Sequence, residues 1–107
     1  METASTSTRE QIATTIADNS VVLFMKGSPQ FPQCGFSAAA VKMLSEAGAT
    51  NFAYVNVLED NAIREGIKQY SSWPTIPQLY INQEFVGGAD IMRELHQNGE
   101  LARLLQK

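Results

Sequence analysis

The fold is decided by residues 21–37, which read VVLFMKGSPQFPQCGFS. Residues 21–25 are all apolar and include β-branched side chains, a pattern typical of a buried strand. Residues 26–33 contain two prolines and a glycine and predict a loop. From residue 36 to residue 47 apolar side chains recur at helical spacing, and Gly48 ends the pattern. The sequence therefore predicts a strand, a loop and a helix in succession, with Cys34 where the loop meets the helix.

Helices and strands continue to alternate on both sides of this unit. A capping box formed by Ser7 and Glu10 predicts a helix before the first strand. Downstream, the pattern predicts a strand at 52–57, a helix at 60–70, a hairpin of strands at 79–81 and 85–86, and helices at 90–96 and 101–105. The hairpin turn is Asn82-Gln83, which lacks the glycine that such turns favour. This order predicts an α/β fold, a small mixed sheet with helices on both faces.

Length and charge narrow the class of function. The chain has 107 residues, which suits a single domain, and a net charge of −3 without any run of like charges. We therefore expect neither nucleic acid nor an anionic membrane as partner. The longest apolar run, residues 21–25, is far shorter than the roughly 20 residues that span a bilayer. The first nine residues lack the apolar segment of a secretory signal, so we expect a cytoplasmic protein, with a processed mitochondrial or plastid form as the open alternative.

The single cysteine, Cys34, is the first candidate for chemistry. One cysteine excludes an internal disulfide, which suits a reducing compartment, and together with one histidine it cannot build a zinc site within one chain. The N–H groups of the predicted helix, and Lys26 if it folds back, would lower the pKa of the thiol. Ser37 stands where a C-x-x-C motif has its second cysteine, so redox turnover needs a thiol from outside the chain. Position alone leaves open whether Cys34 is reactive or simply a small buried apolar residue.

Other candidate positions have plain alternatives. Pro77 follows Ile76 and, taken alone, is an ordinary trans proline of a loop. Residues 87–90 read GGAD and could bind an anion at a helix N-terminus, but a simple turn in which the aspartate caps the helix is the better interpretation. His96 is the only histidine and could serve Cys34 as a base, although an exposed helix position is favoured.

Four motifs taken together resemble the monothiol glutaredoxins of the CGFS type. They are KGSP at 26–29, CGFS at 34–37, WPTIPQL at 73–79 and GGAD at 87–90. In this order they extend the resemblance over nearly the whole chain, from Gln11 to Leu105. The resemblance implies a thioredoxin-like (glutaredoxin) fold, a four-stranded mixed sheet with helices on both faces. It further implies a single glutaredoxin domain over residues 1–107, of which we expect 1–6 to be a flexible tail.

The resemblance also implies a glutathione site. It makes Cys34 the catalytic residue and Pro77 a cis-proline beside it. Glutathione carries two carboxylates and one ammonium group, which suit basic side chains, backbone N–H groups and a carboxylate respectively. Two departures from the family pattern are Ala89, where many members have cysteine, and Ile76, where many have phenylalanine. By motif position the glutathione contacts are Lys26, Arg64, the backbone of Ile76, Pro77, Ala89 and Asp90.

Two functions remain open. A 2Fe-2S cluster needs four ligands, normally thiolates, and one chain supplies only Cys34. Ligand counting therefore predicts a homodimer that shares a labile cluster between two Cys34 thiolates and two glutathiones. The resemblance implies delivery of that cluster to BolA-family proteins and iron–sulfur acceptor apoproteins. The alternative is a glutathione-dependent thiol–disulfide oxidoreductase with a one-cysteine mechanism, an activity that the resemblance implies is weak. An interaction module with an inert Cys34 is the third and plainest interpretation.

Overall fold

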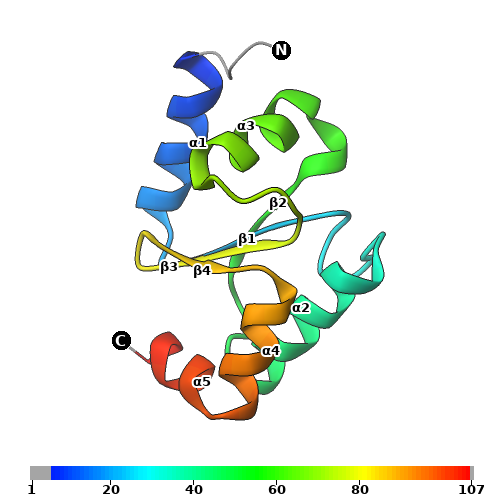
Figure 1. Ribbon diagram of the computed structural model, residues 1–107, viewed down its shortest axis with the longest axis vertical. Helices are drawn as coiled ribbons and strands as arrows, with labels where there is room; N and C mark the ends of the chain where they lie inside the picture. Colours follow the sequence, from blue (N-terminus) through cyan, green and yellow to red (C-terminus); the bar gives the residue numbers. More distant parts are fainter. Residues whose placement is uncertain (1–5, 107) are drawn as a thin grey trace.

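Four strands form one mixed sheet in the order β2-β1-β3-β4 (Figure 1). The computed structural model describes residues 6–106. Strands β1 and β2 are parallel, whereas β1–β3 and β3–β4 are antiparallel, so the predicted mixed sheet is confirmed. The strands are β1 (Val21–Met25), β2 (Ala53–Asn56), β3 (Gln78–Ile81) and β4 (Glu84–Gly87).

Helices cover both faces of the sheet, as predicted (Figure 1). One face carries α1 (Thr6–Asp18) and α3 (Asn61–Ser71). The other carries α2 (Gly35–Glu46), α4 (Ala89–Gln97) and α5 (Glu100–Leu105). None of these helices, within the described part of the chain, is long and apolar enough to cross a membrane.

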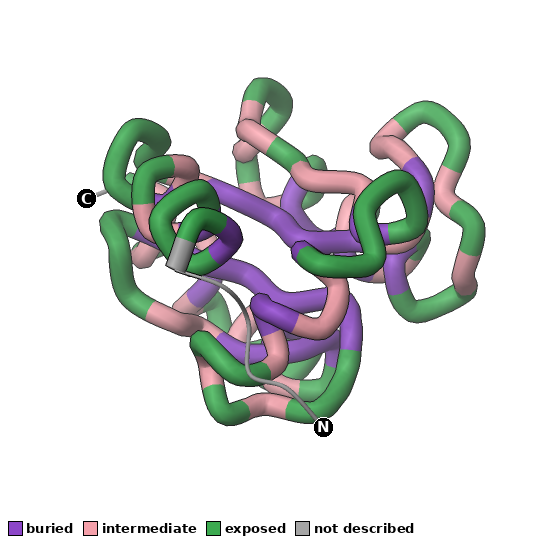
Figure 2. The backbone as a smooth tube through the Cα atoms, turned by 90° about the horizontal axis from the view of Figure 1, so that it is seen from above, coloured by how far each residue is buried: buried purple, intermediate pink, exposed green. Residues whose placement is uncertain are grey.

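Strand β1 is apolar throughout because it contributes to two cores. Val22 and Phe24 pack into the core beneath α1 and α3, whereas Leu23 and Met25 pack into the core beneath α2, α4 and α5. Alternate side chains of a strand point to opposite faces, so a strand covered on both sides has no polar face. Figure 2 shows these buried segments running through the middle of the molecule, with exposed residues outside them.

Every predicted element is present in the predicted order, with small shifts at the ends. Helix α1 begins at Thr6, so Ser7 lies within its first turn and the prediction of Ser7 as its N-cap is wrong. Thr6 likewise does not belong to a tail, while residues 1–5 of the predicted tail lie outside the described residues. Strand β2 ends at Asn56 because the Asn56 side chain accepts a hydrogen bond from the Leu58 N–H at 3.0 Å and starts the 3-10 helix η1 (Val57–Glu59).

The hairpin between β3 and β4 forms without a glycine in its turn. Asn82 and Gln83 have φ angles of 50° and 71°, so both adopt the left-handed conformation that a type I′ turn requires. Asparagine tolerates this conformation better than most residues. The Asn82 N–H also donates to the Ser20 carbonyl at 2.7 Å, which ties the turn to the start of β1.

Candidate functional site

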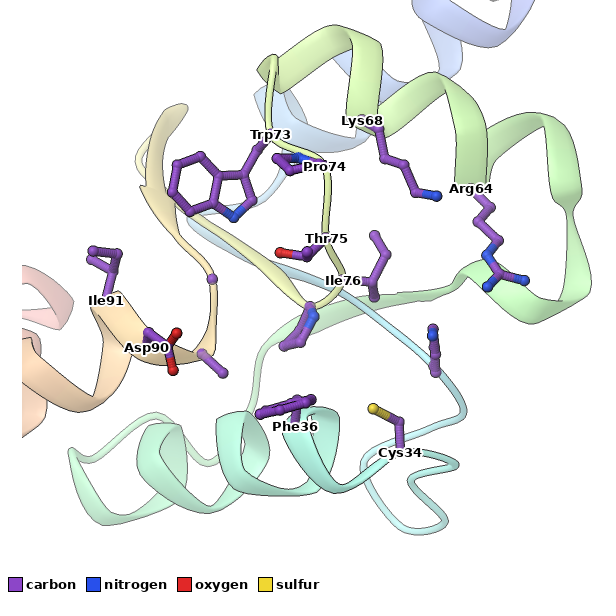
Figure 3. Close-up of a pocket in the computed structure, with 14 residues that line it drawn as sticks. Cys34, Phe36, Arg64, Lys68, Trp73, Pro74, Thr75, Ile76, Asp90 and Ile91 are labelled. Carbon is purple, nitrogen blue, oxygen red and sulfur yellow. The ribbon is translucent and has the colours of Figure 1, made fainter.

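A cleft of about 380 Å³ opens beside Cys34 (Figure 3). Its walls come from the end of β1, the first turn of α2, helix α3, the loop before β3 and the start of α4. Every residue that the sequence assigned to the glutathione site lines this one cleft, although glutathione contact itself stays a prediction. The lining residues are Lys26, Cys34, Phe36, Arg64, Lys68, Trp73, Pro74, Thr75, Ile76, Pro77, Gly88, Ala89, Asp90 and Ile91.

Cys34 is the N-cap residue of α2 and is partly exposed. Its backbone is extended, with φ −158° and ψ 140°, and its side chain points into the cleft (Figure 3). The pKa of the thiol is lowered from its usual value, chiefly by a hydrogen bond from the Ser37 N–H. Partial burial opposes this effect, and the Phe36 N–H, the Lys26 charge and the Ser37 hydroxyl add to it. The structure therefore favours a reactive Cys34 over an inert buried one.

Ser37 is fully buried, and its Oγ accepts a hydrogen bond from the Lys26 N–H at 3.0 Å. This bond joins the residue that follows β1 to the first turn of α2. From the sequence, Ser37 was expected to matter only as a missing second thiol. Its spacing, however, indicates that it is buried. Ser37, Ala40 and Leu44 are all buried and lie on one face of α2. A polar side chain on a core-facing stripe needs a hydrogen-bond partner.

The loop of residues 27–33 folds back on itself. Gly27 has φ +91°, and a Cβ atom there would lie 2.5 Å from the Phe31 carbonyl oxygen, so this position requires glycine. The Gly27 N–H donates to Asn56 Oδ1 at 2.9 Å, and the Gln33 N–H donates to the Lys26 carbonyl at 2.9 Å. The loop is thereby fixed at both ends, which holds Cys34 in place relative to the sheet.

Basic side chains gather at the Cys34 end of the cleft. Arg64 and Lys68 lie one turn apart on α3, and both line the cleft on the side opposite Cys34 (Figure 3). Asp60 is the N-cap of α3, and its carboxylate accepts hydrogen bonds from the N–H groups of Ala62 and Ile63. Lys68, which also contacts Glu65 at 3.3 Å, was assigned no ligand role from the sequence. Together with Lys26 these side chains give the cleft a cationic end, which suits a carboxylate.

The start of α4 forms the opposite end of the cleft. Gly88 is the N-cap and provides no side-chain hydrogen bond, so the prediction that the aspartate of the GGAD motif caps this helix is wrong. Asp90 is instead the second residue of α4, and its side chain is 92% exposed. The first N–H groups of α4 therefore have no side-chain cap and, with the helix dipole, suit an anion. The Asp90 carboxylate beside them suits a cation.

The wall between the two ends is the loop before β3. The Ile76–Pro77 peptide bond is cis, as the family resemblance implied. Buried Gln78 holds the loop in place, because its Nε2 donates to the carbonyls of Trp73 at 3.0 Å and Thr75 at 3.1 Å. No role for Gln78 was predicted from the sequence, since both of its partners precede the strand that contains it.

His96 takes no part in this cleft. Its Nε2 lies 3.0 Å from Glu46 Oε1, at the last residue of α2. Cys34 caps the other end of α2. Because a helix rises about 1.5 Å per residue, His96 and Cys34 lie far apart. A nucleophile–base pair between Cys34 and His96 is therefore excluded. The described residues also contain no group of three or more His, Cys, Asp or Glu side chains that could hold a metal ion.

Comparison with known proteins agrees with this geometry. Residues 21–86 match the Glutaredoxin family. The chain is 57% identical over 104 residues to the mitochondrial monothiol glutaredoxin-5 of Lachancea kluyveri, covering 95% of this chain and 73% of the relative. The chain belongs to the monothiol glutaredoxin family. The Saccharomyces cerevisiae monothiol glutaredoxin-5, also mitochondrial by name, is 52% identical over 96% of this chain and 70% of its own length.

Solved structures place this glutaredoxin in the same fold. The solution structure of reduced poplar apo GrxS14 has a TM-score of 0.79 and 47% sequence identity, over 92% of this chain and 89% of that chain. The thioredoxin-like (glutaredoxin) fold and the monothiol family expected from the four motifs are both confirmed.

Proposed function

We propose that this glutaredoxin binds glutathione in the cleft, with the glutathione sulfur beside Cys34. The supporting observation is the order of charges along the cleft. Lys26 and Arg64 suit the glycine carboxylate, and the uncapped N–H groups at Ala89 and Asp90 suit the carboxylate at the other end. The Asp90 side chain suits the ammonium group. A thiol tripeptide with a charge at each end fits this arrangement.

The middle of the tripeptide would lie against the loop before β3. Ile76 and Pro77 line the cleft between the charged ends, and the backbone of Ile76 would pair with the cysteinyl unit of glutathione. Backbone pairing of this kind does not depend on the side chain. The replacement of a commoner phenylalanine by isoleucine at position 76 should therefore have little effect on affinity.

We further propose that the protein carries a labile 2Fe-2S cluster and delivers it to acceptor proteins. The observation that carries this proposal is that the only thiol of the chain lies, with a lowered pKa, at a cleft suited to a second, external thiol. Two chains and two glutathiones supply the four thiolates that the cluster needs. The cargo-bound state is thus a homodimer. A cluster with so few protein ligands exchanges readily, so BolA-family proteins and iron–sulfur acceptor apoproteins are the proposed partners.

A second candidate function follows from the accessible, acidified sulfur of Cys34. The Cys34 thiolate would attack the glutathione sulfur of a protein–glutathione mixed disulfide and release the protein as a thiolate. A second glutathione thiolate would then attack the Cys34–glutathione disulfide, which forms oxidised glutathione and regenerates the Cys34 thiolate. This route needs one cysteine only.

Anaerobic reconstitution separates the two functions. The chain is incubated with iron, sulfide and glutathione and then passed over a size-exclusion column monitored in the visible range. A coloured dimer with two glutathiones per cluster, absent from Cys34→Ser, is the expected result. A colourless monomer that turns over a glutathionylated substrate rapidly would favour the oxidoreductase instead.

The compartment is a separate proposal. Both curated relatives named above are mitochondrial by name, which supports the processed mitochondrial form that the sequence left open beside a cytoplasmic one. Fractionation of the source cells, with detection of this chain by mass spectrometry, distinguishes the two locations.

A further inference from the structure

A second hollow, which we call the hairpin groove, lies between the β3–β4 hairpin and helices α4 and α5. Its volume is about 270 Å³, and it shares no lining residue with the cleft at Cys34. The turn of the hairpin is at one end of β4, whereas the start of α4 that lines the cleft follows the other end (Figure 1). The hairpin groove is therefore separate from the site described above.

Strand β4 is at the edge of the sheet and pairs only with β3. In an antiparallel ladder, hydrogen-bonded pairs alternate with non-hydrogen-bonded ones, and the pair that flanks a two-residue turn is hydrogen-bonded. Ile81 and Glu84 are that pair, so Tyr80 and Phe85 form the next, non-hydrogen-bonded one. The N–H and C=O groups of Phe85 therefore point away from β3, to the side of β4 where no strand lies.

Phe85 meets the hairpin groove through its backbone. Its ring packs against the core on the other face of the sheet, with centroid distances of 5.8 Å to the Trp73 ring and 5.3 Å to the Tyr80 ring. Side chains alternate along a strand, so Glu84 and Val86 lie on the face that carries α4 and α5. Phe85 nevertheless lines the groove. The groove thus gives access to main-chain hydrogen-bonding groups.

The side chains of the hairpin groove are apolar except at its hairpin end. Val86 on β4, Leu95 on α4 and Leu104 on α5 form the apolar part. Glu84 is exposed, and none of the ion pairs found among residues 6–106 includes it. Strand β4 contains neither proline nor lysine, the residues that commonly block an edge strand. A strand that carries an apolar side chain and a cation on one face would complement this surface.

We propose that the hairpin groove binds an extended segment of a partner protein, which adds to the sheet antiparallel to β4. The central residue of the segment pairs with the backbone of Phe85. In an antiparallel pair the preceding residue then lies opposite Val86, and the following residue lies opposite Glu84. The segment therefore reads, in chain order, an apolar residue, any residue, and lysine or arginine. In such strand addition the main chain supplies affinity and alternate side chains supply specificity.

The hairpin groove and the cleft can be occupied at the same time, because they have no lining residue in common. A partner held at β4 leaves Cys34 accessible. The proposal goes beyond glutathione or cluster binding and does not depend on either of them.

The test uses the synthetic peptide Thr-Val-Thr-Val-Thr-Arg-Thr and the full chain, followed by NMR of the backbone amides. The Phe85 amide should shift and exchange its hydrogen more slowly, because its N–H gains an acceptor. N-methylation of the threonine between valine and arginine removes a main-chain donor and should weaken binding at least about fivefold. The peptide of reversed sequence has the same composition and should also bind more weakly.

Glu84→Lys should weaken binding of the peptide about fivefold, the upper end for an exposed ion pair. Glu59→Lys is the matched control, because Glu59 is also exposed but lies on η1 and does not line the hairpin groove. The rate at which iodoacetamide alkylates Cys34 should be the same with and without the peptide.

Three results would overturn the proposal and leave the functions proposed above untouched. The first is equal affinity of Glu84→Lys and Glu59→Lys, or of the parent and N-methylated peptides. The second is a peptide that shifts only amides of the cleft. The third is a chain that dimerises at rising concentration without peptide and shifts the Phe85 amide, which would assign the edge of β4 to a second copy.

Discussion

The Ser37 hydroxyl accepts a hydrogen bond from the Lys26 N–H at 3.0 Å and is itself fully buried. This contact joins the end of β1 to the first turn of α2, and thereby sets the position of Lys26 relative to Cys34. The same hydroxyl lowers the pKa of the Cys34 thiol, although the Ser37 N–H contributes more. The serine of the CGFS motif is therefore part of the site and not merely a lost cysteine.

Ser37→Ala should weaken both the fold and the site. It leaves the partly buried Lys26 N–H without its acceptor, and loss of one hydrogen bond typically costs about 1 kcal/mol of unfolding free energy. It also removes one donor to the sulfur, so the pKa of Cys34 should rise. Urea unfolding and a thiolate absorbance titration measure the two effects. Ser45→Ala, at an exposed position of the same helix, is the control and should change neither. Identical values for Ser37→Ala and the parent would contradict this role.

The reactivity of Cys34 should follow a pKa below that of an ordinary thiol. Only the thiolate reacts with iodoacetamide, so the midpoint of rate against pH reports this pKa, and Cys34 is the only cysteine that can react. Lys26→Gln should raise the midpoint because it removes a positive charge that favours the thiolate. Added salt should raise it too. A midpoint that Lys26→Gln leaves unchanged would show that the N–H groups of α2 and the Ser37 hydroxyl lower the pKa without help from Lys26.

The same shift predicts how stability depends on pH. The pKa of Cys34 is lower in the folded protein than in the unfolded chain, so ionisation stabilises the fold. The contribution is present in full above the unfolded pKa of about 8.5 and is lost as pH falls through the folded pKa. Urea unfolding measures the free energy of unfolding of the parent and of Cys34→Ser at each pH in this window. The difference between the two proteins should grow as pH rises, because only the parent has the thiol. Parallel curves would contradict the lowered pKa.

Much of the fold could be predicted from the sequence because its signals are local. The apolar run of β1, the helical spacing after Cys34 and the prolines before β3 each identify one element without knowledge of the rest. The missed features depend on contacts between distant segments. Asn56 ends β2 early and also binds the Gly27 N–H, 29 residues away. His96 meets Glu46 across 50 residues.

The residues of the candidate site likewise fall into those that the sequence predicts and those whose roles depend on contacts between distant segments. Cys34, Pro77 and most of the other assigned residues belong to the four motifs, so the family resemblance predicts them, whereas Arg64 lies between two of these motifs. Ser37, Gln78 and Lys68 matter through what they touch or where their helix points. The motifs and the helical spacing place these residues, but the partners that they contact cannot be read from the sequence.

Alanine substitution at two glycines near Cys34 should change the stability of the fold in opposite directions. Gly27→Ala forces a side chain into the left-handed region at φ +91° and towards the Phe31 carbonyl, 2.5 Å away. The backbone strain alone should lower the free energy of unfolding by about 1–3 kcal/mol. Gly35→Ala, in the first turn of α2, meets no atom within 4 Å and should maintain or slightly raise stability. Thermal unfolding of both variants decides the matter, and a Gly27→Ala protein as stable as Gly35→Ala would contradict the role assigned to this loop.

The cationic end of the cleft should recognise the glycine carboxylate of glutathione. γ-Glutamylcysteine retains the thiol and the amino-acid end but lacks that glycine, so the parent should bind it about tenfold more weakly, as expected for loss of a charge-assisted contact. Arg64→Ala should weaken glutathione binding more than it weakens γ-glutamylcysteine binding, because the carboxylate of the dipeptide is on its cysteine, one residue short of the position of the glycine carboxylate. Calorimetry measures the affinity of the parent and of Arg64→Ala for each of the two ligands. Arg103→Gln is the control, since Arg103 contacts Glu100 on α5 and does not line the cleft. If Arg64→Ala weakened both ligands equally, Arg64 would act on the whole cleft, and the glycine end of glutathione would have to be placed elsewhere.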